Sequence, residues 1–335
     1  MKSLTLKETI MKRLSTILVL WLLAASCVDN GYDLSAIDTD DVGIGDEHSI
    51  FTCPLMTLRV AVGDISNERG DLDRILGEAD VWLPDHLPND AEAVDVATLT
   101  GVNGAQRQEA YLSGPEGLLT ALLREIDADP SGGKLDRIAR RIYADYKTEF
   151  LPDYLPADAR EEEYVAAFGA FYRQPATREL IRESIASFAA RYLTTGLNMD
   201  VQPFVLSGID VGTDVRDMIT GGDGSQVSLS LFGTISTDLP VDFSAHPAFQ
   251  TVEAGRDRTL VSFPSFTVRS TADAPTRIEE TKIASEALSV IFEQETRIVL
   301  NVRLESYYPR RPLGAEQGIT VDLKIRRRGG LTLNL

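Results

Sequence analysis

The segment from Asp127 to Ile138 begins like the loop that holds a calcium ion between two helices. Its first, third and fifth positions, Asp127, Asp129 and Ser131, carry side-chain oxygens, and its sixth is Gly132. The twelfth position, where a bidentate carboxylate completes the oxygen shell, is Ile138, and the eighth is Lys134. A turn between two helices accounts for these residues without a metal. The sequence therefore predicts no calcium site here.

The histidines of the chain are His48, His86 and His246, and they are far apart in the sequence. None forms a His-Glu-x-x-His pattern or another spacing typical of a zinc site. His86 lies between two prolines and His246 precedes Pro247, which predicts turns rather than catalytic bases at both positions. We therefore predict neither a metal ion nor a cofactor.

Motifs for acyl transfer and nucleotide use are missing from the sequence: it has no Gly-x-Ser-x-Gly elbow, Walker loop or dinucleotide fingerprint. The glycine-rich stretch 220–225 has no lysine and is typical of a flexible loop. The acids that would serve a glycosidase are Asp210, Asp214, Asp217 and the run Glu161-Glu162-Glu163. The three glutamates are most simply the first turn of a helix, where the helix dipole favours negative charge. We predict that the protein is not an enzyme.

The aromatic and basic residues are likewise more typical of structural roles than of a binding site. Trp82, Tyr307 and Tyr308 are the aromatic residues that would line a glycan groove, although Trp82 is more typical of a core anchor. The runs Arg310-Arg311 and Arg326-Arg327-Arg328 are typical of solvated turns or salt-bridge partners. The formal charge of −18 repels nucleic acid phosphates and anionic lipid headgroups, so neither is a predicted direct partner.

The start of the chain has the layout of a secretory signal peptide. Lys12 and Arg13 precede the short apolar run 14–23, which is too short to be a comfortable membrane span. Because this charged start follows Met11 directly, we interpret Met11 as the true initiator. Residues 1–26 are therefore the predicted signal peptide.

The small residues Ala24, Ala25 and Ser26 lead into Cys27, and this pattern resembles the lipobox of bacterial lipoproteins. The resemblance implies cleavage before Cys27 and acylation of its thiol, although the commonest lipobox has a leucine where this chain has Ala24. The alternative is an ordinary signal peptide with a coincidental cysteine. Acyl chains anchor a protein lastingly, since each buried methylene adds about 0.8 kcal/mol. Cys53 then remains without a disulfide partner, and its apolar surroundings predict a small buried hydrophobe rather than a reactive thiol.

Residues 27–47 are acidic and rich in turn-forming residues, which is typical of a tether. The phrase Tyr32-Asp33-Leu34-Ser35-Ala36-Ile37-Asp38-Thr39, close behind Cys27, resembles lipid-anchored envelope lipoproteins of the Bacteroidetes. The resemblance covers residues 1 to 50 and implies an outer-membrane address without an activity. Acids near the cysteine can mark cell-surface export in that group, and Asp29 and Asp33 match this only in part. The sequence is therefore compatible with an anchored protein on either the periplasmic side or the cell surface.

The patterns along the remaining chain predict an α+β fold. Alternation such as that of Val60 and Val62 predicts a β-rich segment over 48–115. Helical spacing predicts a subdomain of about four helices over 116–200. Strict alternation returns over 201–335 and predicts an antiparallel sheet or sandwich.

Three local predictions concern the last two segments. Pro175 is expected to open the last helix of the subdomain. The Gly329-Gly330 pair predicts a hairpin between the strand 319–326 and the residues that follow. Residues 279–294 fit a helix or a strand equally well.

These features predict a lipid-anchored cell-envelope protein with a noncatalytic binding or assembly role and an envelope protein or glycan as its partner. One alternative is an anchored glycan-processing hydrolase or accessory, which needs two facing carboxylates in a groove with exposed aromatics. Another is a carrier of lipid or another hydrophobic ligand, which needs an apolar cavity between the sheets.

Overall fold

The computed structural model describes residues 42–44, 48–62, 72–129, 131–147, 150, 158–197, 204–206, 228–253, 255–329 and 331–333. Cys27, the signal peptide, the tether up to residue 41, Asp210, Asp214, Asp217 and the stretch 220–225 lie outside these residues. The chain divides into two units, Met1–Ile44 with Thr332–Leu335, and Gly45–Leu331. The second unit contains a four-stranded and a six-stranded antiparallel sheet together with the helices, so the predicted α+β class is confirmed.

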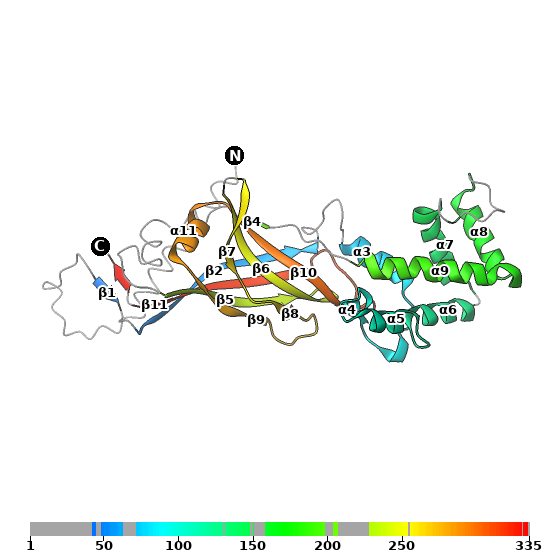
Figure 1. The fold of residues 1–335 in the computed structure, drawn as a ribbon, viewed down its shortest axis with the longest axis horizontal. Helices are drawn as coiled ribbons and strands as arrows, with labels where there is room; N and C mark the ends of the chain where they lie inside the picture. The colour runs from blue at the N-terminus through cyan, green and yellow to red at the C-terminus, as the bar shows by residue number, and fades with distance from the viewer. Residues whose placement is uncertain are drawn as a thin grey trace. The chain divides into compact units, whose positions relative to one another are not determined.

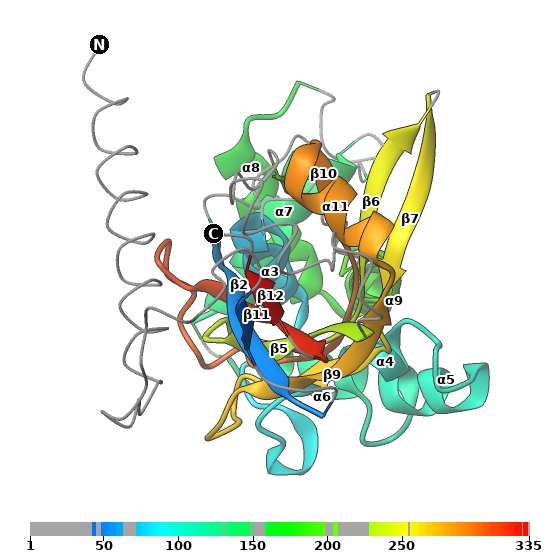
Figure 2. The ribbon, with the colours of Figure 1, turned by 90° about the vertical axis from the view of Figure 1, so that its left-hand side faces the viewer.

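The larger unit is built on a β-sandwich (Figure 2). One sheet has the order β2 (Ile50–Ala61), β11 (Gly318–Arg328), β5 (Ser228–Thr237), β9 (Thr276–Ile283). The other has the order β3 (Val94–Asp95), β10 (Thr296–Tyr307), β6 (Val241–Glu253), β7 (Arg256–Ser262), with β4 (Phe204–Leu206) also on β10 and β8 (Phe266–Val268) also on β6. Because β2 pairs with β11 along its length, strands from before and after the helices belong to one sandwich.

Alternation along β10 and β11 produces the inner faces of the two sheets. In β10, Ile298, Leu300 and Leu304 are buried, as the alternation predicts. In β11 the buried set is Ile319, Val321, Leu323 and Ile325. Cys53 is half-buried on β2 opposite Ile325, and burial raises the pKa of its thiol, which keeps the group protonated.

The predicted C-terminal hairpin is wrong. Gly329 takes the left-handed φ of 110° and donates from its N–H to the Ser49 carbonyl at 3.0 Å. However, β12 (Leu331–Leu333) pairs with β1 (Val42–Ile44) in a separate two-stranded sheet. The physical reason is that β2 and β5 already occupy both edges of β11, so β11 has no edge to offer the strand that follows.

The residues between β2 and β4 form the helical part, which Figure 1 shows beyond one end of the sandwich strands. Its helices are α3 (Leu72–Trp82), the 3₁₀ turn η2 (Pro88–Asp90), α4 (Val96–Leu99), α5 (Ala105–Ser113), α6 (Leu118–Ala128), α7 (Gly133–Tyr146), α8 (Glu161–Tyr172) and α9 (Pro175–Thr195). The four helices predicted over 116–200 are confirmed as α6 to α9, and Pro175 begins α9. Residues 279–294, which fit a helix or a strand equally well in the sequence, form the end of strand β9 and then helix α11 (Ser285–Glu293).

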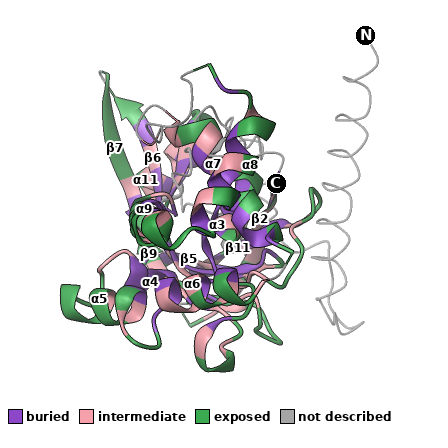
Figure 3. Cartoon of the chain, turned by 90° about the vertical axis from the view of Figure 1, so that its right-hand side faces the viewer, coloured by how far each residue is buried: buried purple, intermediate pink, exposed green. Residues whose placement is uncertain are grey.

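The prediction of a β-rich segment over 48–115 is correct for β2 and wrong for most of the rest, because the helical part begins at Leu72. Helix α3 buries Leu72, Ile75, Leu76, Ala79 and Trp82, which share one helical face. Val94 lies in the short strand β3, whereas Val96 begins α4 after the N-cap residue Asp95, whose carboxylate accepts a hydrogen bond from the Thr98 N–H at 2.9 Å. Helix α5 has no such buried stripe: Leu112 is its one buried residue, and the helix is mostly exposed in Figure 3.

Aromatic rings join three helices in the helical core. Trp82 of α3 is fully buried and lies with its ring centroid 6.3 Å from that of Tyr146 in α7. The Tyr146 ring stacks on Phe188 of α9 at 4.6 Å. Trp82 is therefore a core anchor, as its sequence neighbours indicated, and it is not available to line a glycan groove.

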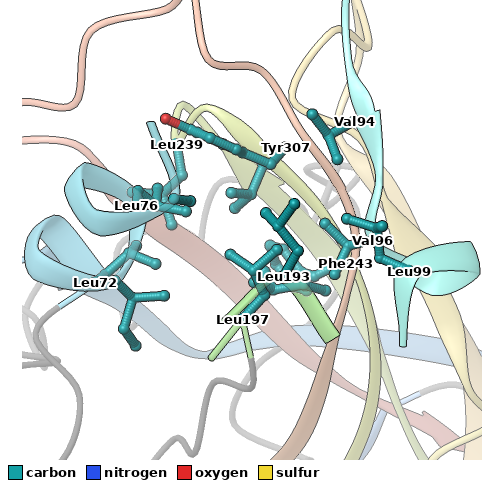
Figure 4. Packing of buried hydrophobic residues seen from close by; sticks show 14 of the residues in the cluster. Leu72, Leu76, Val94, Val96, Leu99, Leu193, Leu197, Leu239, Phe243 and Tyr307 are labelled. Atoms are coloured by element: carbon teal, nitrogen blue, oxygen red, sulfur yellow. The ribbon is translucent and has the colours of Figure 1, made fainter. Parts of the chain in front are cut away.

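The helical part and the sandwich share one hydrophobic core. Figure 4 shows the junction, where Leu72 and Leu76 of α3, Leu193 and Leu197 near the end of α9, and Phe243 of β6 converge. Each large apolar side chain that is fully buried contributes about 1.5–3 kcal/mol. The helices are therefore packed onto the sandwich rather than tethered beside it.

A charged network covers the outer face of the four-stranded sheet. The Glu280 carboxylate of β9 accepts hydrogen bonds from Ser230 at 2.6 Å and from Arg328 at 2.5 Å, and it pairs with Arg326. The hydrogen bonds from Arg328 and Ser230, with the Arg326 charge, lower the pKa of Glu280 to about 2. Arg326 and Arg328 are thus salt-bridge partners, whereas Arg327, between them, is buried.

We expect Glu280→Gln to lower the free energy of unfolding by about 1 kcal/mol at pH 7. Because the folded pKa lies below the unfolded one, this stabilisation is complete above the ordinary glutamate pKa and is lost as pH falls toward 2. Urea unfolding of wild type and variant between pH 7 and pH 3 measures the difference. The exposed Glu279→Gln on the same strand is the control, and a wild-type–variant gap that does not narrow below pH 4.5 contradicts the assignment.

We also expect Gly233→Ala to lower the free energy of unfolding by about 2 kcal/mol or more. A Cβ atom at Gly233 in β5 would lie 1.9 Å from the Asp322 carbonyl oxygen of β11, so the two strands must separate. Gly77→Ala in α3 is the matched control, because no heavy atom lies within 4 Å of its Cβ position. Chemical denaturation that shows equal effects for the two substitutions would contradict this packing.

Candidate functional site

A pocket of about 320 Å³ lies where α3 meets the sandwich. One wall is helix α3, and the opposite wall is the loop between β10 and β11. The lining residues are Asp73, Leu76, Gly77, Asp80, Pro240, Tyr307, Pro309, Arg310, Arg311, Pro312 and Leu313. We call this the junction pocket. Its volume is within the range of small-molecule sites, roughly 300–1,000 Å³.

The α3 wall follows from the amphipathic pattern of the helix. Its apolar stripe is buried, which leaves Asp73, Gly77 and Asp80, at spacings of four and three residues, along an exposed face. Asp80 Oδ1 accepts a hydrogen bond of 2.7 Å from the Tyr307 hydroxyl at the end of β10. Partial burial raises the pKa of Asp80, and the neighbouring Asp85 carboxylate adds to this increase, while the Tyr307 hydrogen bond and Lys134 oppose it.

The loop wall is held by prolines and by a second tyrosine. Tyr308 donates from its hydroxyl to Asp242 at 3.0 Å, and Arg311 stacks over the Tyr308 ring at 4.6 Å while donating to Ser270. Pro309 and Pro312 restrict the backbone on either side of Arg310. Arg310 is exposed at the pocket.

A buried lysine lies beneath the C-terminal end of α3. The Lys134 ammonium, whose side chain is 3% exposed, donates to the carbonyls of Asp80 at 3.3 Å and Leu83 at 2.5 Å. It also pairs with Asp85 Oδ1 at 2.8 Å. These bonds satisfy carbonyls that a helix end would otherwise leave without a donor, and they join α7 to α3.

The acidic residues of the calcium-like loop 127–138 make structural hydrogen bonds and ion pairs. Asp127 accepts hydrogen bonds from Tyr172 at 2.7 Å and from Arg178 at 2.6 Å, and it pairs with Arg182. Asp129 accepts from the Ser131 N–H at 2.8 Å and so shapes the turn into α7. Within the part of the chain that the structure describes, no three His, Cys, Asp or Glu side chains form a group that could hold a metal ion.

His246 lies in strand β6 rather than in the predicted turn, and its ring contacts two serines that no sequence pattern connects with it. Its Nε2 is 2.9 Å from the Ser262 Oγ, and its Nδ1 is 3.0 Å from the Ser265 Oγ. The Ser262–His246 distance suits a nucleophile and its base. The third member is a neutral hydroxyl, which cannot stabilise an imidazolium as a carboxylate does, and all three residues are exposed. Pro247 is tolerated because it lies opposite the break between β7 and β8.

The remaining candidate residues have structural partners. Glu161 and Glu163 lie in the first turn of α8, as predicted, and pair with Arg140 and Arg160. The exposed His86 is next to Glu125, with 3.4 Å between its Nδ1 and a carboxylate oxygen. Tyr307 is only 3% exposed, so its ring offers no open stacking surface.

Between the two sheets the structure contains an entirely apolar cavity of about 20 Å³. Met56, Phe249 and Ile298 are among its lining residues. That volume accommodates little more than one water molecule. The described conformation has no space for an acyl chain at this place.

Comparison of the chain with protein-family models, with curated proteins and with solved structures finds no match. Among the helices that the structure describes, none combines the length and hydropathy needed to cross a bilayer.

We expect Lys134→Met to lower the free energy of unfolding by about 3 kcal/mol, because two carbonyls and the Asp85 carboxylate lose a buried donor. The exposed Lys282→Met is the matched control and should change it by less than about 0.5 kcal/mol. Guanidinium unfolding followed by circular dichroism measures both. Similar small effects for the two variants would show that Lys134 does not hold α3 in place.

Proposed function

We propose that this protein is a lipid-anchored component of the cell envelope with a noncatalytic binding role, held in the outer membrane by acyl chains on Cys27. The observation that carries the proposal is the signal-peptide pattern of the sequence, with Lys12 and Arg13, an apolar run and then small residues directly before Cys27. An acidic stretch and then a folded α+β unit from Gly45 follow it, which is the order expected of an anchored domain.

The junction pocket supports binding as the role of the folded unit. Its walls belong to α3 and to the loop after β10, and both are fixed by the shared core and by the Tyr307–Asp80 hydrogen bond. A concave site whose walls are fixed and carry both apolar and charged side chains can orient a bound ligand. The exposed Ser262–His246 pair lacks the carboxylate that an activated serine needs, which favours binding over catalysis.

The two alternatives have less support from the described residues. A glycan hydrolase would use exposed aromatic rings, whereas Trp82 and Tyr307 are buried and the half-buried Tyr308 ring is stacked with Arg311. A hydrophobic carrier would use the space between the sheets, where the cavity is about 20 Å³.

The anchor is tested by intact mass and membrane fractionation of the chain expressed from Met11 in a bacterial host. We expect the wild type to start at Cys27, to carry the added mass of two or three acyl chains and to sediment with membranes. Cys27→Ala should lose the lipid and leave the membrane fraction, because no thiol remains at the cleavage point.

Cys53→Ala is the matched control, since it removes the other cysteine and should keep the lipid. Protease treatment of whole cells then distinguishes a surface-exposed protein, which is degraded, from a periplasmic one. A wild-type protein that is unlipidated and leaves the membrane fraction would overturn the proposal.

A further inference from the structure

The junction pocket contains charges that the fold does not use. Among the described residues, Asp73 and Arg310 have no hydrogen-bond or ion-pair partner. Asp80 also lines the pocket, and its Oδ1 accepts a hydrogen bond from Tyr307, which leaves Oδ2 as a further acceptor. Arg311 differs from Arg310, because its guanidinium already stacks on Tyr308 and binds Ser270. One wall therefore presents free carboxylate oxygens and the other presents a free guanidinium.

Gly77 is a second, independent feature of the same pocket. It lies in the interior of α3, where glycine costs up to about 1 kcal/mol relative to alanine. Apart from its chain neighbours and the nearby backbone of α3 itself, no heavy atom lies within 4 Å of a Cβ built at this residue, so packing against the rest of the protein does not require glycine. A side chain would instead project between Asp73 and Asp80 and fill the pocket. The missing side chain gives this wall its depth.

The arrangement of charge selects the ligand. An isolated anion at Arg310 would face two carboxylates, and an isolated cation at Asp73 would face Arg310 and Arg311. A ligand that carries both charges meets an opposite charge on each wall. Guanidinium binds carboxylate through parallel hydrogen bonds, and carboxylates accept from an ammonium. The half-buried Leu313, which also lines the pocket, adds apolar surface for a small side chain of the ligand.

We propose that the junction pocket binds a small zwitterion of the amino-acid or short-peptide class, with its ammonium at Asp73 and Asp80 and its carboxylate at Arg310. This assignment rests on the proposed binding role and names the ligand class for it. It uses no covalent step, in keeping with a noncatalytic protein.

The test is isothermal titration calorimetry of the mature lipidated chain in detergent, with alanyl-alanine and alanine as probes. We expect saturable binding of at least one probe. N-acetyl-alanyl-alanine and alanyl-alanine amide each lack one charge and should bind at least tenfold more weakly than the dipeptide, because one wall of the pocket is then without a partner.

Two kinds of variant test the location. Asp73→Asn and Arg310→Gln should each weaken binding tenfold or more, while Asp257→Asn, an exposed carboxylate on β7 away from the pocket, should leave it unchanged. Gly77→Leu should abolish binding and keep or raise the thermal midpoint, because leucine favours helix more than glycine does. That combination separates a filled pocket from a damaged fold.

Absence of heat with both probes at millimolar concentration would overturn the assignment, and so would binding that survives Gly77→Leu. Either result leaves the anchor intact, because the mass of the same preparation reports acylation at Cys27 independently. Failure of the proposed function is seen in that mass, and failure of the ligand class is seen in the calorimetry.

Discussion

The buried ammonium of Lys134 is the constraint on which the junction of the protein depends. An ammonium that is excluded from water must donate hydrogen bonds to nearby acceptors, since an unpaired buried charge costs several kcal/mol. Lys134 finds these acceptors in the Asp80 and Leu83 carbonyls at the end of α3 and in Asp85. Asp80 makes two of the bonds at this place. Its backbone carbonyl accepts from Lys134 of α7, and its carboxylate accepts from the hydroxyl of Tyr307 at the end of β10. A single residue therefore connects the helical part to the sandwich through polar bonds.

This connection explains how an exposed pocket can have fixed walls. The apolar face of α3 is locked in the shared core by Leu72 and Leu76, so the opposite face carries Asp73, Gly77 and Asp80 to a defined place. The loop wall is held by the Tyr308–Asp242 hydrogen bond and by its prolines. A site whose walls are positioned by other interactions loses little conformational entropy when a ligand binds. Such preorganisation is a property of recognition sites, and it does not require a reactive group.

The sequence predicted those parts of the fold whose patterns repeat several times. Strands β10 and β11 and helices α6 to α9 each show a buried stripe that local periodicity reveals. The same signal was present in α3, at Leu72, Ile75, Ala79 and Trp82, but the prediction of a β-rich segment over 48–115 was based on alternation such as that of Val60 and Val62, which lies at the end of β2. Helix α5 gave no signal, because it buries only Leu112.

The pocket and the C-terminal pairing depended on distant parts of the chain. Asp73 and Arg310 line one pocket only because the helices are inserted between β2 and β5, and no local spacing in the sequence connects them. Gly329 takes a left-handed φ, but the predicted hairpin does not form, because β2 and β5 pair with both edges of β11. The glycine sets the backbone conformation at residue 329, whereas the sheet topology determines that β12 pairs with β1.

The net charge of −18 acts on the same pocket from a distance. A strongly negative protein attracts cations and repels anions within about one Debye length, roughly 8–10 Å at physiological salt. Arg310 alone would therefore hold an anion weakly, since the surrounding field opposes it. An ammonium on the same molecule is attracted by that field and is bound by Asp73 and Asp80, so it offsets the repulsion of the carboxylate it carries. The long-range charge of the chain and the short-range arrangement of the pocket thus favour the same kind of ligand, one with both charges.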